Sequence, residues 1–412
     1  MANKNIPQIR FKGFDGEWEE QELCDTSVCS IDTGCPFDSK DFDENGKYLV
    51  ITNGNIQDDT TFVNSNDCNR ITIDEKSSYH LKKGEILITM DGTVGRSAIV
   101  NDYGMVLAQR VGRLKPIING YFLYYLLNTG NFSKTMIAIG HGGTIKHISL
   151  DEIGSYKLRV AKSDKEQTRI ASLFTSLDKQ ISCSEAKLDK LRTIKKTLLK
   201  KMFASQGEKT PQIRFKGFDG EWEEKRLGEI ANRLTRRNSN NECDLPLTIA
   251  SQYGLIDQRE YFNFRVASSN ITNYFLLKKG EFAYNKSTSD GYPWGSIKRL
   301  DRYPMGVLST LYIIFELKNN SVVSDYVVSY YNTKNWYNSV KKIAAEGARN
   351  HGLLNISPIE FFTTNIQLPQ NKKEQTKIAS LFTALDKQIS LQEQKIEKLR
   401  AIKKTLLKKM FV

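Results

Sequence analysis

Two glycine-rich stretches in the first half of the 412-residue chain carry polar side chains that could bind a nucleic acid or a phosphate. The stretch DGTVGR ends at Arg96 and also offers Thr93, and GHGGTIKH ends in Lys146 and His147. Glycine lets a backbone approach a ligand closely, and these side-chain types hold phosphates or read base edges. The alternative for any single residue among them is an ordinary turn with an exposed side chain.

The second half of the chain has polar stretches in corresponding places. NKSTSDGYPWG contains Lys286 and Ser287, and EGARNH contains Arg349 and Asn350. Matched placement in both halves favours a binding role over a chance accumulation of turn residues. We therefore predict that these four side chains and the four in the first half contact DNA.

Sequence motifs for catalysis are missing. The chain has no G-x-x-x-x-G-K-[ST] phosphate loop and no G-x-G-x-x-G dinucleotide fingerprint. No two of its nine prolines are adjacent, so the Pro-Pro core of the catalytic loop of amino-methyltransferases is absent. Its four histidines are not spaced at metal-ligand intervals, and its six cysteines form no C-x-x-C pair. We expect a non-catalytic chain with reduced cysteines, no metal and no cofactor of its own.

The charge of the chain points to a polyanionic partner. The formal net charge is +13 at pH 7, and the lysine-rich stretches 165–203 and 373–412 carry +6 each. A solvated helix surface explains most single lysines better, although the total would still attract DNA. No run reaches the length of a membrane span, and the first 20 residues lack the apolar core of a signal peptide. We expect a cytoplasmic protein without membrane contact.

The strongest pattern in the sequence is one long stretch that occurs twice, at residues 165–203 and 373–411. The two copies are identical at 31 of 39 positions and are offset by 208 residues. Neither contains Gly or Pro, and both are rich in the helix formers Leu, Lys, Glu, Gln, Ile and Ala. Each copy is therefore predicted to be a helix about 58 Å long.

Apolar residues in both copies step by threes and fours, as in the contact face of a coiled coil. We predict that the helices pair antiparallel, because the chain builds a whole domain between them and must re-enter at the equivalent end. Ser184 and Gln392 lie in this face as a polar layer that could fix the register. The alternative is two separate amphipathic helices, each docked on its own domain. The predicted pairing residues are Leu177, Ile181, Leu188, Leu191, Leu385, Ile389, Ile396 and Leu399.

A second repeat opens each half of the chain. The fourteen residues PQIRFKGFDGEWEE occur at 7–20 and again, unchanged, at 211–224, and we interpret them as a packing motif with aromatic anchors. The segments that follow differ in sequence but share a Leu-Lys-Lys-Gly-Glu turn and strand-like runs such as 86–89, 106–114 and 308–317. Residues 120–128 and 324–339 are predicted to be helical. Mixed strands and helices of this kind predict two similar α+β domains.

The predicted organisation is a tandem repeat with a pseudo-twofold relation between its halves. Each half consists of an entry motif, a domain and a long helix. The expected boundaries are a first domain at 1–164, a first long helix at 165–203, a second domain at 204–372 and a second long helix at 373–412.

These motifs occur in a fixed order: P-x-I-R-F-x-G-F-x-G-x-W, L-K-K-G-E, G-T-V-G-R and K-E-Q-x-x-I-A-x-L-F-x-x-L-D. The ordered set resembles the specificity subunit of type I restriction-modification enzymes, which act in bacterial defence. The resemblance covers essentially the whole chain. The second half departs from it at Lys286-Ser-Thr-Ser289, which replaces the glycine loop of the first half, so loop contacts cannot be carried over there.

The resemblance implies two target-recognition domains that each read one half of a bipartite double-stranded DNA site, held apart by the two helices. It also implies partners: two modification subunits that bind S-adenosylmethionine and methylate adenine, and restriction subunits that use ATP and Mg²⁺ to translocate and cut. Two other functions stay open. One is a stand-alone site-specific nuclease or methylase, and the other is a coiled-coil scaffold that does not touch DNA.

Overall fold

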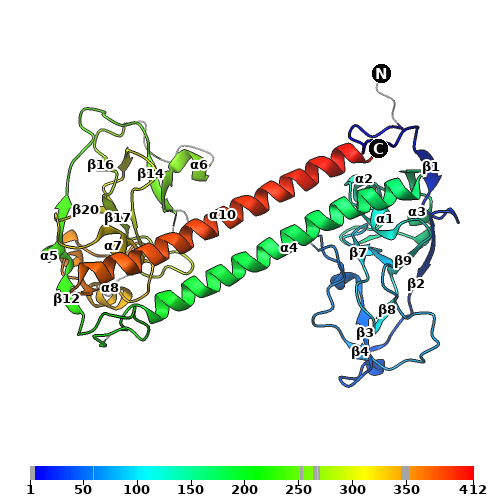
Figure 1. Cartoon of the computed structure of the whole chain (residues 1–412), viewed down its shortest axis with the longest axis horizontal. Coiled ribbons are helices and arrows are strands. Elements are labelled where there is room, and N and C mark those ends of the chain that lie inside the picture. The colour runs from blue at the N-terminus through cyan, green and yellow to red at the C-terminus, as the bar shows by residue number, and fades with distance from the viewer. Residues whose placement is uncertain are drawn as a thin grey trace. The chain divides into compact units, whose positions relative to one another are not determined.

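The computed structural model describes residues 5–58, 60–205, 207–250, 254–262, 267, 270–344 and 352–412. The chain forms two compact units: unit 1 contains Met1–Ala186 and Gln392–Val412, and unit 2 contains Lys187–Leu391. The borders fall inside the two long helices, α4 (Asp164–Lys201) and α10 (Lys372–Met410), which are labelled in Figure 1. Each unit therefore contains one domain, the start of one long helix and the end of the other.

The domain of unit 1 is built on a four-stranded antiparallel sheet with the order β2-β9-β5-β7. A three-stranded sheet, β4-β3-β8, and two short ladders, β1-β11 and β6-β10, complete it. The strands are β1 (Glu19–Glu22), β2 (Cys29–Thr33), β3 (Tyr48–Ile51), β4 (Arg70–Ile71), β5 (Ile86–Thr89), β6 (Asp91–Gly92), β7 (Ser97–Ile99), β8 (Met105–Leu107), β9 (Val111–Pro116), β10 (Lys146–His147) and β11 (Lys157–Val160). The helices are η1 (Ser39–Asp41), η2 (Asn53–Asn55), α1 (Gly120–Leu127), α2 (Asn131–Ile139) and α3 (Leu150–Gly154).

The domain of unit 2 has a four-stranded antiparallel sheet with the order β13-β20-β17-β18 and three two-stranded ladders, β12-β21, β14-β15 and β16-β19. The strands are β12 (Glu223–Arg226), β13 (Ala231–Leu234), β14 (Leu247–Ala250), β15 (Gly254–Asp257), β16 (Phe275–Lys278), β17 (Phe282–Asn285), β18 (Ser296–Arg299), β19 (Met305–Leu308), β20 (Ile313–Leu317) and β21 (Asn365–Leu368). The helices are α5 (Leu227–Ile230), α6 (Gln258–Phe262), α7 (Ser324–Tyr331), α8 (Tyr337–Ile343) and α9 (Pro358–Phe361).

The two sheets share one strand arrangement. In unit 1 the central strand β5 pairs with β9 and β7, and in unit 2 the central strand β17 pairs with β20 and β18. Each central strand directly follows a Leu-Lys-Lys-Gly-Glu turn. The expectation of a mixed α+β chain with two domains is confirmed, and the register of one sheet can be carried to the other strand by strand.

Three continuous elements predicted from the sequence are interrupted in the structure. The run 106–114 is divided between β8 and β9, and 308–317 between β19 and β20, while 324–339 contains two helices, α7 and α8. Neither strand break contains Gly or Pro, so the usual turn signal is missing there. The helix break was signalled by Asn332-Thr333-Lys334-Asn335, a polar run that ends α7.

The entry motif of each half is fixed to the first turn of a long helix by a buried ion pair. Arg10 donates to both carboxylate oxygens of Glu166 at 2.7 and 2.8 Å. The same guanidinium donates to the carbonyls of Gly16 and Asp15. Glu166 is only 1% exposed, so its charge is compensated by the bidentate arginine.

The same arrangement recurs in unit 2. Arg214 donates to Glu374 at 2.7 and 2.8 Å and to the carbonyls of Gly220 and Asp219. Glu374 is also 1% exposed. The repeated Arg of the entry motif and the repeated Glu of the long helix are thus two halves of one contact.

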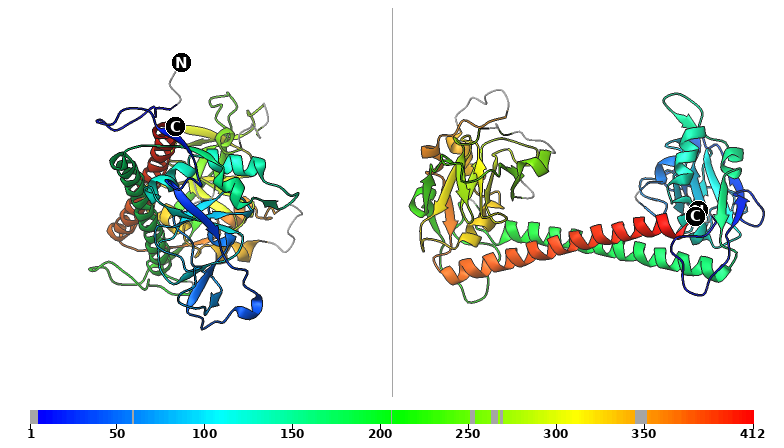
Figure 2. Two further views of the ribbon diagram at one scale, coloured as in Figure 1. Left: turned by 90° about the vertical axis from the view of Figure 1, so that its right-hand side faces the viewer. Right: turned by 90° about the horizontal axis from the view of Figure 1, so that it is seen from above.

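The core of each domain is completed by the end of a long helix from elsewhere in the chain. In unit 1, Phe411 packs against Trp18, Phe122 and Phe174, with ring centroids 5.6–6.1 Å apart. The backbone carbonyl of Lys409, two residues before Phe411, accepts a hydrogen bond from the backbone N–H of Ile9 at 2.9 Å. Figure 2 shows the last turns of α10, in red, beside this domain.

Unit 2 uses the end of α4 in the same way. Phe203 packs against Trp222, Tyr326 and Phe382, with ring centroids 5.5–6.4 Å apart. The backbone N–H of Ile213 donates to the carbonyl of Lys201 at 2.9 Å. The tryptophan of each repeated motif therefore packs against the Phe that lies just after a long helix.

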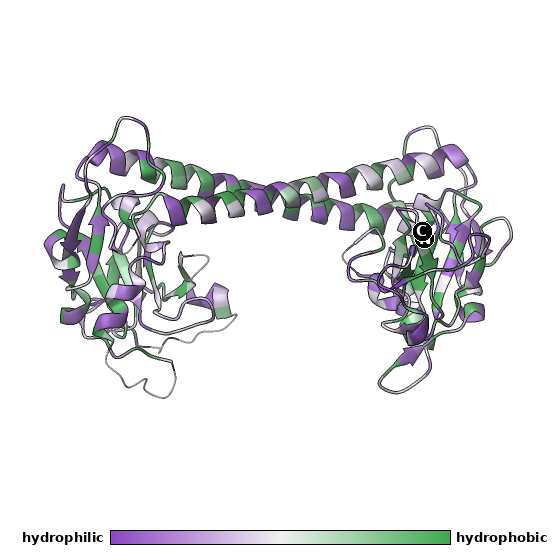
Figure 3. Ribbon diagram, turned by 90° about the horizontal axis from the view of Figure 1, so that it is seen from below, coloured by the Kyte–Doolittle hydropathy of each residue, from purple (hydrophilic) through white to green (hydrophobic). Residues whose placement is uncertain are grey.

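Within each unit the two helix segments run in opposite directions. In unit 1, Asp178 forms an ion pair with Lys403, and further along α4 the backbone carbonyl of Ser184 accepts a hydrogen bond from the Gln392 side chain at 3.2 Å. In unit 2, Lys195 forms an ion pair with Asp386. All eight predicted pairing residues are buried or half-buried. Figure 3 shows apolar residues alternating with polar ones along both helices.

Among the helices that the structure describes, none has the length and apolar character that crossing a lipid bilayer would demand.

Candidate nucleic-acid interface

The two glycine-rich stretches of unit 1 lie side by side. In the ladder formed by β6 and β10, His147 pairs with Asp91 and Lys146 pairs with Gly92. The backbones of His141 and His147 exchange two hydrogen bonds, of 2.9 and 2.7 Å, which close the second stretch into a loop. Segments separated by about fifty residues in sequence therefore form one surface at the end of the central strand β5.

The matching stretches of unit 2 meet in the same way. Ser287 forms a β-bridge with Leu353, and the N–H of Thr288 donates to the carbonyl of Gly352 at 2.7 Å. This contact lies just beyond the central strand β17, as its counterpart lies just beyond β5. Each domain thus presents a pair of loops at the equivalent edge of its own four-stranded sheet.

The predicted DNA-contacting side chains of unit 1 are held to different degrees. Thr93 is exposed. Arg96 is half-buried and forms an ion pair with Asp58 at 2.6 Å, so much of its charge is already compensated. Lys146 donates to the carbonyl of Gly140 at 2.9 Å and so helps to close its own loop.

The predicted residues of unit 2 are only partly described. Lys286 donates to the carbonyl of Ile356 at 3.2 Å, and Ser287 is exposed. Arg349 and Asn350 lie outside the described residues. Lys146 and Lys286 therefore both bind backbone carbonyls of their own domains, and a role for either ammonium in contacting DNA stays a prediction.

A polar cluster on the unit 1 surface joins the predicted residue His147 to two residues that the sequence did not single out, Asp91 and Arg110. Asp91 accepts from Arg110 at 2.9 Å and lies 2.7 Å from Nδ1 of His147. Partial burial raises the pKa of Asp91, but the hydrogen bonds from His147 and Arg110 outweigh it, and the net pKa is lowered. Asp91 is therefore an anion that fixes two exposed donors.

Arg110 owes its position to an unusual backbone conformation. Its φ is +63°, in the left-handed region that residues other than Gly seldom adopt. The residue lies in the turn between β8 and β9, and its carbonyl accepts from the N–H of Met90 at 3.3 Å. Because this turn closes against the end of β5, the Arg110 side chain is directed at Asp91.

The turn after Asp91 depends on glycine. Gly95 has a φ of +79°, and a Cβ at this position would lie 2.8 Å from Cβ of Met136. Its N–H donates to the carbonyl of Thr89 at 2.9 Å, which closes the loop onto the end of β5. The second glycine of the DGTVGR stretch is therefore needed for both conformation and space.

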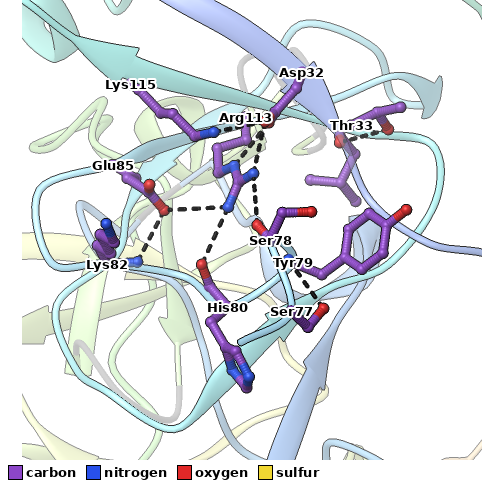
Figure 4. Close-up of polar contacts among 11 residues, drawn as sticks. Asp32, Thr33, Ser77, Ser78, Tyr79, His80, Lys82, Glu85, Arg113 and Lys115 are labelled. Carbon is purple, nitrogen blue, oxygen red and sulfur yellow. Dashed lines mark hydrogen bonds and ion pairs between the residues drawn. The ribbon is translucent and has the colours of Figure 1, made fainter. Parts of the chain in front are cut away.

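A buried ionic cluster braces the sheet beneath this surface (Figure 4). Arg113 is 2% exposed and donates to both carboxylate oxygens of Asp32 at 2.7 and 2.6 Å. Lys115 donates to the same carboxylate at 2.7 Å, and Glu85 lies 3.8 Å from the guanidinium. Burial raises the pKa of Asp32, but Arg113 and Lys115 lower it further than burial raises it, whereas burial dominates for Glu85 and raises its pKa.

The same arginine also binds the segment that precedes the Leu-Lys-Lys-Gly-Glu turn. Arg113 donates to the carbonyls of His80 at 3.1 Å and Ser78 at 3.0 Å. One buried guanidinium thus joins β9, β2 and this connecting segment. Since Arg113 lies on β9, three residues after Arg110, the cluster also steadies the turn that carries Arg110.

Unit 2 replaces this cluster with a different one. The strand register places Ile314 where unit 1 has Arg113, because Ala283 pairs with Ile314 as Leu87 pairs with Arg113. Glu281, the counterpart of Glu85, is instead bound by Arg236 at 2.7 and 2.8 Å. The two domains keep the acidic residue of the shared turn and supply its partner from different segments, strand β9 in unit 1 and the residues just after β13 in unit 2.

The described part of the chain offers no obvious site for a metal. Within these residues no group of three or more His, Cys, Asp or Glu side chains is arranged to hold an ion. All six cysteines are free. The polar side chains of the candidate surface are donors and acceptors for recognition, and they do not form a nucleophile with an adjacent base.

Comparison with known proteins supports a specific interpretation of this surface. Residues 16–193 match the family model described as "Type I restriction modification DNA specificity domain". The crystal structure of the S subunit of a type I restriction-modification system from M. genitalium is similar over 99% of both chains, with 17% identity and a TM-score of 0.63. That structure shares the fold of this chain.

Two further structures have lower scores. One is described as showing complex assembly and conformational transition of the type I R-M system, with 12% identity, coverage of 96% of this chain and 97% of that chain, and a TM-score of 0.49. The other is the HsdS subunit from Thermoanaerobacter tengcongensis, with 13% identity, coverage of 96% of both chains and a TM-score of 0.44.

The family match lies in the first half of the chain, and the internal repeat extends it to the second. The entry motif recurs there unchanged, and the long helix recurs with 31 of 39 residues identical. The contacts that these repeats make, Arg10 with Glu166 and Arg214 with Glu374, are the same in both units. Residues 16–193 therefore match a type I restriction-modification DNA specificity domain, and the repeated motifs indicate a related domain in the second half of the chain.

Proposed function

We propose that each of the two domains reads one half of a bipartite double-stranded DNA site, at the surface where its two loops meet. The supporting observation is the pair of matched sheets that carry different side chains at the same edge. A shared scaffold with different surfaces is expected if both domains dock on DNA alike and recognise different bases. On this proposal, the eight side chains predicted from the sequence lie at or near the DNA.

The two long helices, in this proposal, form one antiparallel coiled coil that sets the gap between the half-sites. Its support is the antiparallel course of the helix segments within each unit and the repeated apolar seam. The corresponding organisation is a pseudo-twofold repeat with domains at 1–164 and 204–372 and helices at 165–203 and 373–412. The near identity of the helices, against the divergence of the domains, fits a fixed separation with variable specificity.

Catalysis in this proposal belongs to partner subunits. Two modification subunits would bind S-adenosylmethionine and methylate adenine, and restriction subunits would use ATP and Mg²⁺. The chain itself would supply DNA recognition and a scaffold. The +6 charge of each long helix is a surface that could contact either DNA or an acidic partner.

The test uses the gap between the half-sites. Insertion of seven helix-forming residues into both α4 and α10 at matched positions near their centres keeps the seam in phase. It lengthens each helix by about 10 Å. In DNA with a rise of about 3.4 Å per base pair, the unspecified gap should grow by about three base pairs. Methylation mapping of cells that carry the variant chain with its modification subunits measures this.

The outcomes separate the proposal from its rivals. An unchanged gap with changed half-sites would refute the helices as a ruler. Methylation or cleavage of DNA by the purified chain alone, with cofactors added, would indicate a stand-alone enzyme. Binding of a partner protein without any salt-sensitive affinity for DNA would indicate a scaffold.

A further inference from the structure

Three matched positions at the loop edge of the two domains differ in every residue. In unit 1 they are Asp91, two residues after β5, Arg110 in the turn before β9, and His147, two residues before the serine that caps α3. By the same rules the positions in unit 2 are Ser287 after β17, Leu311 before β20, and Asn355 before the serine that caps α9.

The equivalence rests on strand register. In unit 1 β5 and β9 pair so that the N–H of Met90 reaches the carbonyl of Arg110. Continuing the register of β17 and β20 by the same count places Lys286 opposite Leu311. The register therefore matches Asp91 with Ser287 and Arg110 with Leu311. Asn355 is matched with His147 by its distance from the capping serine, whereas the residue that bridges Ser287 is Leu353.

The structure assigns these positions as specificity determinants, with Arg110 reading a guanine in the half-site of unit 1. The assignment rests on the proposed function, because it requires that this edge face DNA. Arg110 is 62% exposed and is held by Asp91 through one nitrogen, at 2.9 Å. A guanidinium offers five donors in a planar fork. Arg110 can therefore bind Asp91 through one nitrogen and still donate to O6 and N7 of guanine through its other N–H groups.

Asp91 acts as the positioning residue of this cluster. Its carboxylate holds Arg110 and His147 together, so DNA binding does not carry the entropy cost of ordering these two side chains. The left-handed backbone at Arg110 is unfavourable for an arginine, and a residue held in such a conformation at a surface edge is a mark of function.

The matched residues of unit 2 are uncharged and have a different chemistry. Leu311 is 58% exposed. An apolar side chain at a base edge contacts the thymine methyl group, and an asparagine pairs best with adenine. Ser287 and Asn355 are both exposed. We expect this half-site to contain no guanine that depends on the matched position.

The test compares Arg110→Ala, Arg110→Lys and Asp91→Asn in the full chain bound to its modification subunits. The wild-type site is first obtained by methylation mapping, and affinity is then measured on DNA in which each guanine in turn is replaced by 7-deazaguanine, which lacks N7. Replacement of one guanine in one half-site should weaken DNA binding by the wild-type chain. The same replacement should not change DNA binding by Arg110→Ala. Arg110→Ala should lower affinity for the cognate site about 5- to 150-fold.

The variants separate base reading from a phosphate contact. Arg110→Lys keeps the charge but not the fork, so it should lose the guanine preference as Arg110→Ala does. Asp91→Asn should weaken the same preference without changing the second half-site. Lys134→Ala, an exposed cation of α2 in the same domain, is the control and should leave every position unchanged.

Two results would overturn the assignment. In the first, the loss of affinity caused by Arg110→Ala adds to the loss caused by 7-deazaguanine at every position tested. This would mean that Arg110 reads no guanine N7. The other is a uniform loss across sequences that Arg110→Lys restores, which would mean a phosphate contact. Failure of the proposed function looks different: removal of the whole chain would then leave methylation of the host DNA unchanged.

Discussion

Replacement of Arg10 by methionine should strongly destabilise unit 1. Arg10 is 14% exposed and supplies both hydrogen bonds to the carboxylate of Glu166, which is 1% exposed. Methionine fills a similar volume but leaves this carboxylate buried without its partner. Breaking a buried ion pair in this way costs about 3–5 kcal/mol. The carbonyls of Asp15 and Gly16, which also lose a donor, are on exposed residues and can bind water, so they add little.

The assay must resolve the two units, because a chain with two compact units need not unfold in one step. Hydrogen exchange of the full-length chain in increasing urea, followed by mass spectrometry of peptides, reports each unit separately. Arg10→Met should lower the unfolding free energy for peptides of unit 1, and Arg214→Met should do the same for unit 2. Lys12→Met, an exposed cation in the same motif, should change stability by less than about 0.5 kcal/mol.

The double variant Arg10→Met with Glu166→Met removes both charges together. It should recover at least half of the loss, since replacing a whole buried pair by apolar residues is often close to neutral. A cost for Arg10→Met no larger than that for Lys12→Met would refute the reasoning. It would mean that the carboxylate of Glu166 is not desolvated in solution, and that the entry motif is held by its aromatic side chains alone.

Three further predictions concern single contacts. Phe411→Ala should destabilise unit 1 and Phe203→Ala should destabilise unit 2, each by about 3–5 kcal/mol, in the same exchange experiment. The lowered pKa of Asp32 adds stability that is complete above the unfolded value of about 3.9 and is lost as pH falls through the folded pKa, so Asp32→Asn should flatten the acid dependence of unit 1. Tyr125→Phe should cost about 1.5–3 kcal/mol in urea unfolding, because Tyr125 donates to the Asp178 carboxylate at 2.8 Å.

Much of the fold follows from local sequence pattern. Helix periodicity places α4 and α10 to within about two residues, because nothing in either stretch competes with a helix. Alternation and the Leu-Lys-Lys-Gly-Glu turn place the central strands, and Ile86–Thr89 is a strand exactly where it was predicted. These elements depend on neighbours close in sequence, which is the information that a single sequence contains.

The candidate site was harder to predict, because its geometry depends on strand pairing. Thr93, Arg96, Lys146 and His147 were chosen as donors on flexible loops, yet Lys146 binds its own backbone and Arg96 is paired with Asp58. Arg110 was hidden inside a run that was predicted as one strand. The left-handed turn there contains no Gly, Asn or Pro, so no local signal separated β8 from β9.

The buried cluster around Arg113 was missed for a related reason. An arginine within an apolar strand is unusual, but the sequence does not show which carboxylate faces it. Asp32 lies 81 residues away and becomes its partner only through the β2–β9 register. The signal that could have found it is the arginine itself, since a charge in a buried strand requires an acidic partner.

The ends of the long helices impose an order on synthesis and folding. Trp18 is among the first residues made, yet the ring that packs against it, Phe411, emerges 393 residues later. Until then the aromatic residues of the first domain lack this partner, whereas Phe203 is already made when its partners Trp222, Tyr326 and Phe382 are synthesised. The half that is translated first is thus the last to complete its core, and its aromatic surface stays exposed until Phe411 is made. Proteases and chaperones therefore have most access to the first domain of the nascent chain. A mutation or truncation in the last few codons would destabilise this first domain.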